Sequence, residues 1–443
     1  GVNVKTIDMK RRLQAFEEVK LGLTEDEALA EASRCLQCPV PQCSRGCPVG
    51  IDIKAFIARI REKDYDGASE IIRKDNSLPA ICGRVCPQEN QCEGSCPMKI
   101  HIGDLERFIA DRTEPKVTRP NLDKRKAAIV GSGPGGLTCA RDLMMKGFQV
   151  TIFEALHAAG GVLRYGIPEF RLPKEIIDKE IKALEDLGID IRLNQVVGKT
   201  ISLEQVEKDH DAVFIANGAG LPVFLDMPGE DLKHVYSANE FLVRNNLMKA
   251  YRDDHRTPIR KAVKAVVIGG GNVAVDAARV ARRLGSEVTI AYRRTREEMP
   301  ARVEEIEHAL EEGIVLQELA SPVEISGKNS VEGIRLEKMS LGDPDASGRR
   351  KPIPTGETTL VPCDMVIIAI GQRPNPLILD SLEKIGIRTD KGMIVVDDNM
   401  QTTNPRFYAG GDIVGGNATV IKAMGDGRKA AASISCQVCQ PGR

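Results

Sequence analysis

Residues 126–136 read Lys126-Ala-Ala-Ile-Val130-Gly131-Ser-Gly133-Pro-Gly-Gly136. The first five residues predict a buried strand, and the glycines predict a tight turn that leads into a helix through Met145. A second strand, Gln149 to Phe153, ends directly before Glu154. This order of strand, glycine-rich turn, helix, strand and acid is typical of a dinucleotide-binding βαβ unit.

Each glycine of this turn has a physical role. Gly131 permits the tight turn, Gly133 lets a pyrophosphate approach the backbone amides, and Gly136 lets the helix pack closely on the strand. The amino end of the helix faces the anion. Glu154 is placed to accept a hydrogen bond from a ribose hydroxyl. We therefore predict a nucleotide site on Gly131, Gly133, Gly136 and Glu154.

A second unit of the same kind follows. The strand Ala265 to Ile268 leads into Gly269-Gly-Gly271-Asn272-Val-Ala274, a helix, and the strand Glu287 to Ala291. Where the first unit has an acid, this one has Arg293-Arg294 after Tyr292. Since arginine can pair with a 2′-phosphate that a carboxylate would repel, the second site is predicted to prefer NADP(H) over NAD(H). The alternative is that both arginines are solvated surface residues.

An FAD site followed by an NADP site implies hydride transfer between nicotinamide and flavin. The run Phe407-Tyr-Ala-Gly-Gly-Asp412 predicts a strand that returns to the first unit, with Asp412 near the ribityl chain of the flavin. Residues Ala418 to Ala432 predict a helix whose amino end could stabilise the anionic reduced flavin. No Ser/His/Asp triad, zinc-protease motif or phosphate-transfer loop accompanies these elements, so electron transfer is the expected chemistry.

Eight of the twelve cysteines fall between Cys35 and Cys96, in two groups. The groups are Cys35, Cys38, Cys43 and Cys47-Pro48, then Cys82, Cys86-Pro87, Cys92 and Cys96-Pro97. Two-cluster ferredoxins interleave their ligands, because the cysteine before proline reaches across to the other cluster. The same logic predicts two 4Fe-4S clusters, with Cys47 serving the second cluster and Cys96 completing the first. Two four-thiolate zinc sites are the alternative.

The other cysteines give weaker indications. Cys139 lies in a predicted helix and Cys363 begins an apolar strand, so both are expected to be inert core residues. The pair Cys436 and Cys439 near the carboxyl end has a spacing that by itself is weak support for a redox or metal role. No cysteine pair stands near the end of the first glycine-rich unit, where a flavin disulfide reductase would need one.

Composition excludes several classes of protein. The 443 residues carry 62 Lys+Arg and 63 Asp+Glu, a formal net charge of -1 that provides no field for nucleic acid or anionic lipid. There is no tryptophan and only 4% aromatic residues, which disfavours base stacking. No stretch is apolar enough for a membrane helix, and the first thirty residues lack the apolar centre of a signal peptide. Cytoplasm is the expected location.

The chain is expected to be an α/β protein with two Rossmann-like, three-layer dinucleotide-binding domains, preceded by an α-helical cysteine domain. Thr24-Glu-Asp-Glu27 is a capping box that predicts a helix running toward Ser33. Prolines punctuate the cysteine segments, so the cysteines are expected on loops between short helices. The charge run Ala301 to Glu312 is predicted to be the solvated face of a helix.

Taken together, the motifs resemble those of the small (β) subunit of glutamate synthase and its relatives. These relatives include the amino-terminal half of dihydropyrimidine dehydrogenase and the large subunit of NADH-dependent reduced ferredoxin:NADP oxidoreductase. The resemblance covers essentially the whole chain. It rests on Cys35-Leu-Gln-Cys38, Cys82-Gly-Arg-Val-Cys86-Pro87, Gly160-Gly-Val-Leu-Arg-Tyr-Gly-Ile-Pro168, Gly269-Gly-Gly-Asn272, Tyr292-Arg-Arg294, Met299-Pro-Ala301 and Ala409-Gly-Gly-Asp412.

The resemblance implies a domain order and a set of site residues. Residues 1–120 would be the iron–sulfur domain, 121–258 and 372–443 the FAD domain, and 259–371 the inserted NADP(H) domain. Gly161 and Thr419 would join the FAD site. Relatives have a non-cysteine cluster ligand at the position of Glu106 and a free cysteine at that of Cys82. The implied ligand sets are Cys35, Cys38, Cys43 and Cys96 for cluster 1, and Cys47, Cys86, Cys92 and Glu106 for cluster 2.

Two alternatives stay open within this reading. The stretch from Cys96 to Glu106 looks shorter than in most relatives, so Cys82 remains an alternative fourth ligand of cluster 2, and Glu106 could be a surface carboxylate on a helix. The stretches 235–242, 246–251 and 419–425 look most like the bifurcating transhydrogenase branch. That branch implies a hetero-oligomer with a partner redox subunit, and ferredoxin as a possible acceptor. Glutamate synthase, a sulfide dehydrogenase-like subunit and a zinc-stabilised interaction module are the alternatives.

Overall fold

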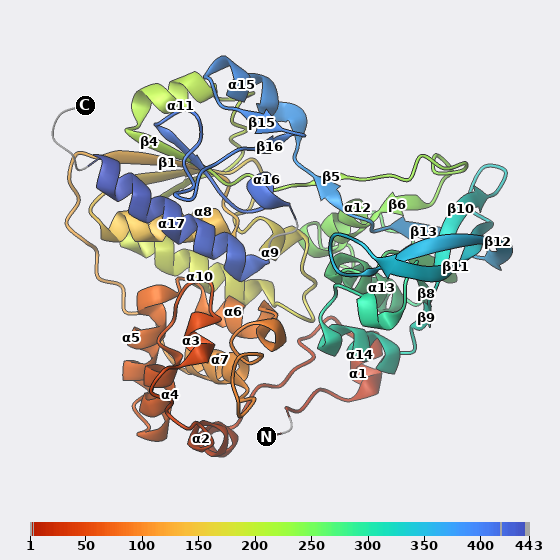
Figure 1. Ribbon diagram of the computed structural model, residues 1–443, viewed down its shortest axis with the longest axis horizontal. Helices are drawn as coiled ribbons and strands as arrows, with labels where there is room; N and C mark the ends of the chain where they lie inside the picture. Colours follow the sequence, from red (N-terminus) through yellow and green to blue (C-terminus); the bar gives the residue numbers. More distant parts are fainter. Residues whose placement is uncertain (1, 3, 417–418, 439–443) are drawn as a thin grey trace.

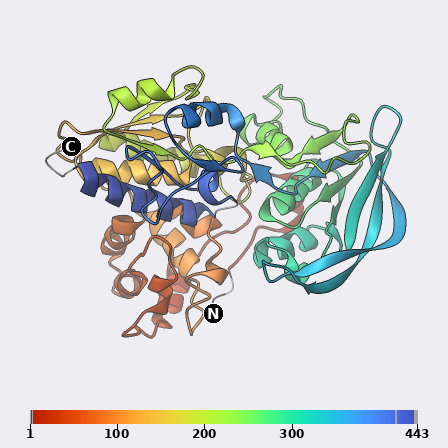
Figure 2. The ribbon, with the colours of Figure 1, turned by 45° about the horizontal axis from the view of Figure 1, so that its top comes forward.

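A computed structural model describes the chain except residues 1, 3, 417–418 and 439–443. Figure 1 shows three parts: a helical part at the bottom left, an α/β part above it, and a second α/β part at the right. The view in Figure 2 gives the same arrangement. None of the helices in the described part of the chain combines the length and apolarity that crossing a membrane needs.

The helical part holds all eight clustered cysteines. The capping box at Thr24 is confirmed, since its hydroxyl accepts from the Glu27 amide and the Glu27 carboxylate accepts from the Thr24 amide. Most of the cysteines lie between helices, but Cys43 and Cys82 lie within short ones. The helices are α1 (Met9–Gln14), α2 (Glu25–Ser33), α3 (Gln42–Arg45), α4 (Ile53–Arg61), α5 (Tyr65–Asp75), α6 (Pro79–Val85), η1 (Gln88–Asn90) and α7 (Ile102–Arg112).

The first α/β part is built on a parallel five-stranded sheet of order β17-β4-β1-β2-β3. Side chains alternate along β1, so Ala127 and Ile129 pack toward α8 while Ala128 and Val130 face the opposite core. Its elements are β1 (Lys126–Val130), α8 (Pro134–Met145), β2 (Gln149–Phe153), α9 (Val162–Tyr165), α10 (Lys174–Leu187), β3 (Asp190–Arg192), α11 (Leu203–Asp209), β4 (Ala212–Ile215), η4 (Pro376–Ile378), α15 (Leu379–Lys384), β15 (Thr389–Asp390), β16 (Met393–Ile394), β17 (Phe407–Ala409), α16 (Asp412–Gly415) and α17 (Val420–Val438).

The carboxyl-terminal segment completes this first sheet. The predicted return strand is confirmed as β17, which pairs in parallel with β4. The helix predicted from Ala418 begins at Val420, and Ala418 itself lies outside the described residues. Figure 1 shows α17 alongside α8 on one side of the sheet and α11 on the other.

The second α/β part repeats the topology, with a parallel sheet of order β6-β13-β7-β8-β9. Helix α13 covers one face, and an antiparallel sheet of order β10-β11-β12 covers the other. The elements are β6 (Val235–Ser237), α12 (Ala238–Leu242), the π-helical turn η2 (Val243–Leu247), β7 (Lys264–Ile268), α13 (Asn272–Arg283), β8 (Glu287–Ala291), η3 (Arg296–Glu298), α14 (Val303–Glu311), β9 (Val315–Gln317), β10 (Ala320–Ser326), β11 (Gly333–Pro344), β12 (Arg350–Pro362) and β13 (Met365–Ile368).

Two segments join the α/β parts, in the short ribbon formed by β5 (Leu221–Pro222) and β14 (Gln372–Arg373). The second sheet already begins with β6, so its first strand lies before the boundary predicted after residue 258. The core confirms this, because Ala238, Phe241 and Leu242 pack with α13.

The solvated face predicted for Ala301 to Glu312 is wrong for two of its acids. Glu305 and Glu312 are 4% and 1% exposed, because arginines from other elements cover them. Arg12 of α1 and Arg279 of α13 both donate to Glu312. The helical spacing was therefore correct, and Glu307 and Glu311 are exposed as predicted, but Glu305 and Glu312 make interior contacts between parts of the chain.

Candidate functional site: two nucleotide turns and a cysteine cavity

The first glycine-rich turn joins β1 to α8 and has the shape of a phosphate cradle. Gly131 has φ of +100°, and a Cβ there would lie 2.5 Å from the carbonyl oxygen of Ala216. A Cβ on Gly133 would meet nothing within 4 Å, so the backbone there borders open space. At Gly136 a Cβ would lie 2.0 Å from the Gly131 oxygen. Only glycine therefore lets α8 pack this closely on the turn. The three glycines therefore occupy the positions that close approach of a pyrophosphate needs.

Glu154, at the end of β2, lies against this turn. It is 6% exposed, and it accepts hydrogen bonds from the Ser132 amide at 3.0 Å and the Leu156 amide at 2.8 Å. The Ser132 hydroxyl also donates to it. The carboxylate thus fixes the turn on the side where a ribose would lie.

Residues far apart in the sequence reach the same turn. Gly161 has φ of +54°, and a Cβ there would lie 2.9 Å from the Gly133 Cα. Burial, together with the charges of Asp412 and Glu154, raises the pKa of Tyr165 to about 12. Thr419 lies just before α17, where its hydroxyl accepts from the Lys422 amide at 3.3 Å. The structure therefore brings Gly161, Glu154 and Asp412 together around the turn.

An orphaned polar atom supports the fit of a cofactor here. The side-chain oxygen of Asn217 is buried and has no hydrogen-bond partner among the described residues. Asn217 follows β4, and its Cα would lie 3.0 Å from a Cβ on Gly131. A buried acceptor without a donor is costly, and a hydroxyl of a bound nucleotide would satisfy it. Asn217 was not among the residues predicted for this site, although its position after a buried strand of the same sheet could have indicated it.

The second glycine-rich turn, between β7 and α13, has the same construction. Gly269 has φ of +141°, and a Cβ there would lie 2.3 Å from the Ala369 oxygen. A Cβ on Gly271 would meet nothing within 4 Å. Ala274 is fully buried at the third position. Asn272 begins α13, and its side-chain oxygen accepts from the Arg302 amide at 3.0 Å.

The two arginines after β8 differ in environment. Arg293 is exposed, and no hydrogen bond or ion pair of its side chain occurs within the described residues. Arg294 is 3% exposed and donates at 2.6 Å to both the Asp345 carboxylate and the Arg350 carbonyl. The structure therefore leaves Arg293 accessible beside the turn and commits Arg294 to the protein.

The cysteines gather in two places. Burial raises the pKa of Cys43, and the neighbouring Cys96 and Cys35 raise it further. Gln37 donates to the Cys35 sulfur at 3.4 Å, and Cys38 is half-buried in the same segment. Cys96, from the second cysteine group, thus lies near Cys43 of the first group; its role as a ligand of cluster 1 stays a prediction.

The second gathering lines a cavity. Its wall contains Cys47, Cys86, Cys92 and Glu106, the four side chains assigned to cluster 2. The other lining residues are Ile51, Ile53, Phe56, Gln88, Gln91, Ile102 and Ile421. Burial raises the pKa of Cys47 and Cys92, and Glu106 raises both further. Bound iron would replace the protons that burial retains on these thiols, so the donor set fits a cluster.

Glu106 is not a surface carboxylate. It is 6% exposed on α7, and burial raises its pKa to about 8. Asn76 donates to it at 2.6 Å. Cys82 lies nearby, 3.7 Å from the Asn76 side-chain oxygen and 3.4 Å from the Met424 sulfur, but it is not among the described residues that line the cavity. Asn76 is a second residue that the sequence analysis missed.

The remaining cysteines lie elsewhere. Cys139 and Cys363 are buried, as predicted for core residues. Cys436 is exposed on α17, and its companion Cys439 lies outside the described residues. Within the part of the chain that the structure describes, no three His, Cys, Asp or Glu side chains are grouped closely enough for a single metal ion.

Comparison with known proteins agrees with this geometry. Residues 125–427 match the family described as pyridine nucleotide-disulphide oxidoreductase, and residues 12–117 match dihydropyrimidine dehydrogenase domain II, 4Fe-4S cluster. The glutamate synthase [NADPH] small chain of Escherichia coli (strain K12) is 36% identical, over 96% of this chain and 94% of its own length. The chain belongs to the glutamate synthase small-chain family.

Other relatives of this chain are named as subunits of different enzymes. The NADP(+)-dependent formate dehydrogenase subunit beta of Moorella thermoacetica is 38% identical, over 88% of this chain and 59% of its own length. Among solved structures, Mycobacterium tuberculosis FprA in complex with NADPH has a TM-score of 0.61 at 24% identity, covering 71% of this chain and 85% of FprA. That likeness confirms the fold of the two α/β parts.

Membership identifies the chain as an oxidoreductase. FAD, NADP(H) and 4Fe-4S clusters are the cofactors of the glutamate synthase small-chain family. The match of the helical part to a 4Fe-4S domain also favours iron–sulfur clusters over the zinc alternative.

Proposed function

We propose that this chain is an electron-transfer subunit that connects NADP(H) with a partner redox subunit through FAD and two 4Fe-4S clusters. When bound, the flavin exchanges a hydride with the nicotinamide and single electrons with the clusters. The role of the protein is to hold these groups in line and to exclude water between them.

The main support for this proposal is the position of the cysteine cavity, which lies between the helical part and α17. One of its walls is Ile421, in the first turn of α17, the helix that completes the FAD-type part of the fold. A Cβ on Gly425 of α17 would lie 3.0 Å from the Pro48 oxygen, next to Cys47. Arg428 donates to the Val49 carbonyl at 2.8 Å. Cluster 2 would therefore sit directly against the flavin part.

We assign the site residues as follows. Gly131, Gly133 and Gly161 would line the FAD phosphates, Glu154 a ribose, and Asp412 and Thr419 the ribityl end. Gly269, Gly271, Asn272 and Ala274 would form the NADP(H) turn, with Arg293 on the 2′-phosphate. The ligand sets are Cys35, Cys38, Cys43 and Cys96, and Cys47, Cys86, Cys92 and Glu106. The cavity lining supports Glu106 over Cys82 as the fourth ligand.

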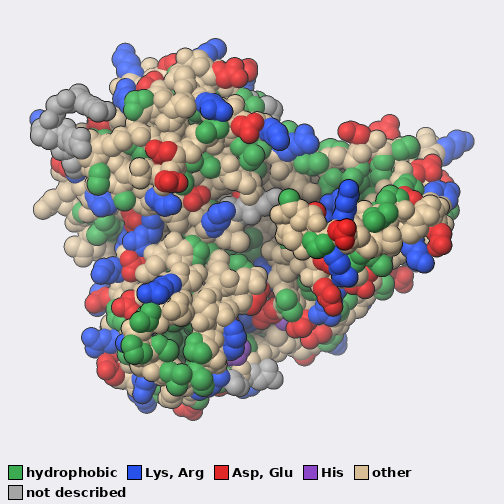
Figure 3. Space-filling model, viewed as in Figure 1, with side chains coloured by type: hydrophobic (Ala, Val, Ile, Leu, Met, Phe, Trp, Pro, Cys, Tyr) green, Lys and Arg blue, Asp and Glu red, His purple; other side chains and the backbone are tan. Residues whose placement is uncertain are grey.

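The partner would dock on the helical part. Figure 3 shows apolar side chains gathered on its outer face at the lower left. Leu36 and Val40, which flank Cys38 in the chain, are 61% and 51% exposed. Exposed apolar residues of this kind are typical of protein-interaction sites. We place the protein in the cytoplasm as part of a hetero-oligomer.

For the terminal reaction we propose an electron-bifurcating transhydrogenase, in which NADPH electrons divide between ferredoxin and NAD. The similarity of the stretches 235–242, 246–251 and 419–425 to that branch supports this choice. Glutamate synthase is the second candidate, because the match to its small chain spans 94% of that protein.

One experiment separates these candidates. NADPH oxidation by the anaerobically purified native complex is measured with ferredoxin alone, with NAD alone, and with both. Turnover that requires both acceptors supports bifurcation. If neither acceptor supports turnover but glutamine plus 2-oxoglutarate does, the protein is a glutamate synthase subunit. Absence of flavin bleaching by NADPH would contradict the whole proposal.

A further inference from the structure

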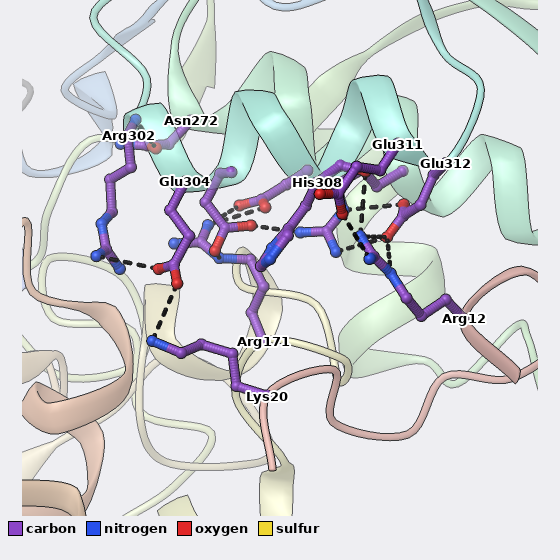
Figure 4. A network of polar contacts seen from close by, with 12 residues as sticks. Arg12, Lys20, Arg171, Asn272, Arg302, Glu304, His308, Glu311 and Glu312 are labelled. Atoms are coloured by element: carbon purple, nitrogen blue, oxygen red, sulfur yellow. Dashed lines mark hydrogen bonds and ion pairs between the residues drawn. The ribbon is translucent and has the colours of Figure 1, made fainter. Parts of the chain in front are cut away.

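Arg302 lies between the NADP-type turn and the cysteine domain. It precedes α14, and its side chain is only 8% exposed. Figure 4 shows it at the end of a polar network that joins Arg12 and Lys20 of the amino-terminal segment to α13 and α14. This network lies outside the cofactor residues assigned above, except at Asn272.

The backbone of Arg302 is attached to the glycine-rich turn. Its amide donates to the Asn272 side-chain oxygen at 3.0 Å, and the amide of Ala301 donates to the Gly270 carbonyl at 3.2 Å. Both acceptors belong to the turn that would receive the nucleotide phosphates. The Asn272 side chain therefore connects the turn directly to the backbone of Arg302.

The guanidinium of Arg302 reaches the other way, to η1 of the helical part. Its Nε and Nη2 each lie 3.1 Å from a Glu89 carboxylate oxygen, and Nη2 donates to the Gln88 side-chain oxygen at 3.0 Å. A two-pronged arginine–carboxylate pair fixes orientation as well as distance. The ion pair with Glu304 at 3.4 Å holds the same guanidinium from its own helix.

Gln88 and Glu89 belong to the loop of cluster 2. They lie between Cys86 and Cys92, and Gln88 lines the same cavity. Gln88 also donates to the Cys82 carbonyl at 3.2 Å. Arg302 thus touches, with one side chain, the segment that carries two of the four assigned ligands. Outer hydrogen bonds of this kind orient metal ligands and tune the metal.

We propose that Arg302 is a positioning residue that couples occupancy of the NADP(H) turn to the redox state of cluster 2. The inference rests on the proposed function, from which it takes the nucleotide and cluster sites. A nucleotide that rearranges Asn272 shifts Arg302, and the shifted guanidinium changes the hydrogen bonds and the charge beside the cluster loop. By linkage, the redox state of the cluster changes nucleotide affinity by the same factor.

The test uses the holoprotein and 2′,5′-ADP, the adenosine portion of NADP, which has no nicotinamide to accept hydride. Affinity for 2′,5′-ADP is measured by calorimetry with cluster 2 oxidised and reduced, and the redox state is followed by electron paramagnetic resonance. In the wild type we expect the two dissociation constants to differ by at least about fivefold. In Arg302→Ala and in Glu89→Gln the ratio falls to about one.

Arg335→Ala is the matched control. Arg335 pairs with Glu324 at 3.4 Å in the antiparallel sheet of the same part, and both side chains are exposed. This variant keeps the wild-type ratio. An unchanged ratio in Arg302→Ala overturns the inference, as does a wild-type ratio of about one. If Arg302→Ala fails to fold or to bind 2′,5′-ADP, an unchanged ratio in Glu89→Gln overturns it.

The proposed function fails in a different way. If the wild type binds no 2′,5′-ADP, or shows no second cluster signal, the site assignments themselves are wrong and the inference falls with them. If binding and both cluster signals are present without coupling, only the role of Arg302 is wrong.

Discussion

Arg293 and Arg294 are neighbours in the chain but have different surroundings. Arg294 is buried and pairs at 2.6 Å with Asp345, whose side chain is 32% exposed, whereas Arg293 is exposed just after β8. Removing Arg294 would take away a buried side chain and its hydrogen bonds to Asp345 and to the Arg350 carbonyl, which is destabilising. We therefore expect the two arginines, which the sequence presents as one phosphate clamp, to serve binding and stability separately.

Replacing these two arginines separately should give different results. Arg293→Ala is expected to raise KM for NADPH by about tenfold or more, the loss of one charge-assisted hydrogen bond, and to leave KM for NADH nearly unchanged. Arg294→Ala should instead lower the thermal unfolding midpoint and affect both nucleotides alike. Initial rates with an artificial one-electron acceptor and thermal unfolding check this. A selective loss of NADPH in Arg294→Ala alone would contradict it and place the 2′-phosphate at Arg294.

The spacing of residues along the chain predicts those site residues that lie close together within one recognisable βαβ unit. The glycines at 131, 133 and 136, and Glu154 at the end of the next strand, all lie within one βαβ unit. Arg302 was not predictable in this way. The partner of Arg302, Glu89, is 213 residues away, and no local pattern indicates such a contact. Long-range polar contacts depend on how the parts dock, which periodicity does not encode.

At the level of elements, α14 is the clearest case. Its alternation of apolar and acidic residues predicts the helix, and the structure confirms Val303–Glu311. Glu307 and Glu311 are exposed, but Glu305 and Glu312, which directly follows the helix, are buried. Arg12, Arg279 and Arg283, which come from α1 and α13, all donate to Glu312. Acidic side chains of a helix therefore become interior where distant basic residues cover them.

Helix α1 should stabilise the second α/β part through Arg12. The Arg12 side chain is 3% exposed and pairs with Glu312 at 3.0 Å and Glu311 at 2.7 Å. We expect Arg12→Ala to lower the free energy of unfolding by about 3 kcal/mol, measured by denaturant titration. The control is Arg11→Ala, whose exposed pair with Glu17 should give no measurable change. Equal effects of the two variants would show that α1 does not hold this part in place.

The same cluster predicts a pH dependence. Burial opposes ionisation of Glu312, but Arg279 and Arg283 outweigh it and lower its pKa from 4.5 to about 2. Because the folded pKa is below the unfolded one, the stabilisation is complete above about pH 4.5 and is lost as pH falls toward 2. The loss amounts to about 3 kcal/mol.

Glu312→Gln tests this dependence. The variant should be less stable than the wild type at neutral pH, and the difference should shrink as pH falls below 4.5. The measurement is the difference in unfolding free energy between the two proteins at each pH. Acid damage to the clusters affects both proteins and therefore cancels in this difference. A difference that does not change with pH would mean that the pKa of Glu312 is the same in the folded and the unfolded protein.

At the scale of the whole molecule, the three parts meet at the cysteine cavity. The cysteine cavity is closed by α17 of the first α/β part, and the loop beside it is held by Arg302 of the second. The duplicated βαβ units predicted the two α/β parts. The docking of the helical part on α17 was not predictable, because Ile421 and Cys47 lie at opposite ends of the chain.

Cys47→Ser tests whether electrons cross this contact. Cys47 is the thiol of the first cysteine group that reaches the cavity against α17, so its loss should remove cluster 2 and leave cluster 1. We expect NADPH to bleach the flavin as in the wild type, while reduction of the remaining cluster slows by about tenfold or more. Stopped-flow absorbance and electron paramagnetic resonance follow the two events.

The control is Cys363→Ser, which changes a buried cysteine of the second α/β part and should leave both rates unchanged. If the remaining cluster is reduced at the wild-type rate in Cys47→Ser, the flavin must reach cluster 1 by another route, and the linear order of groups proposed for this chain is wrong.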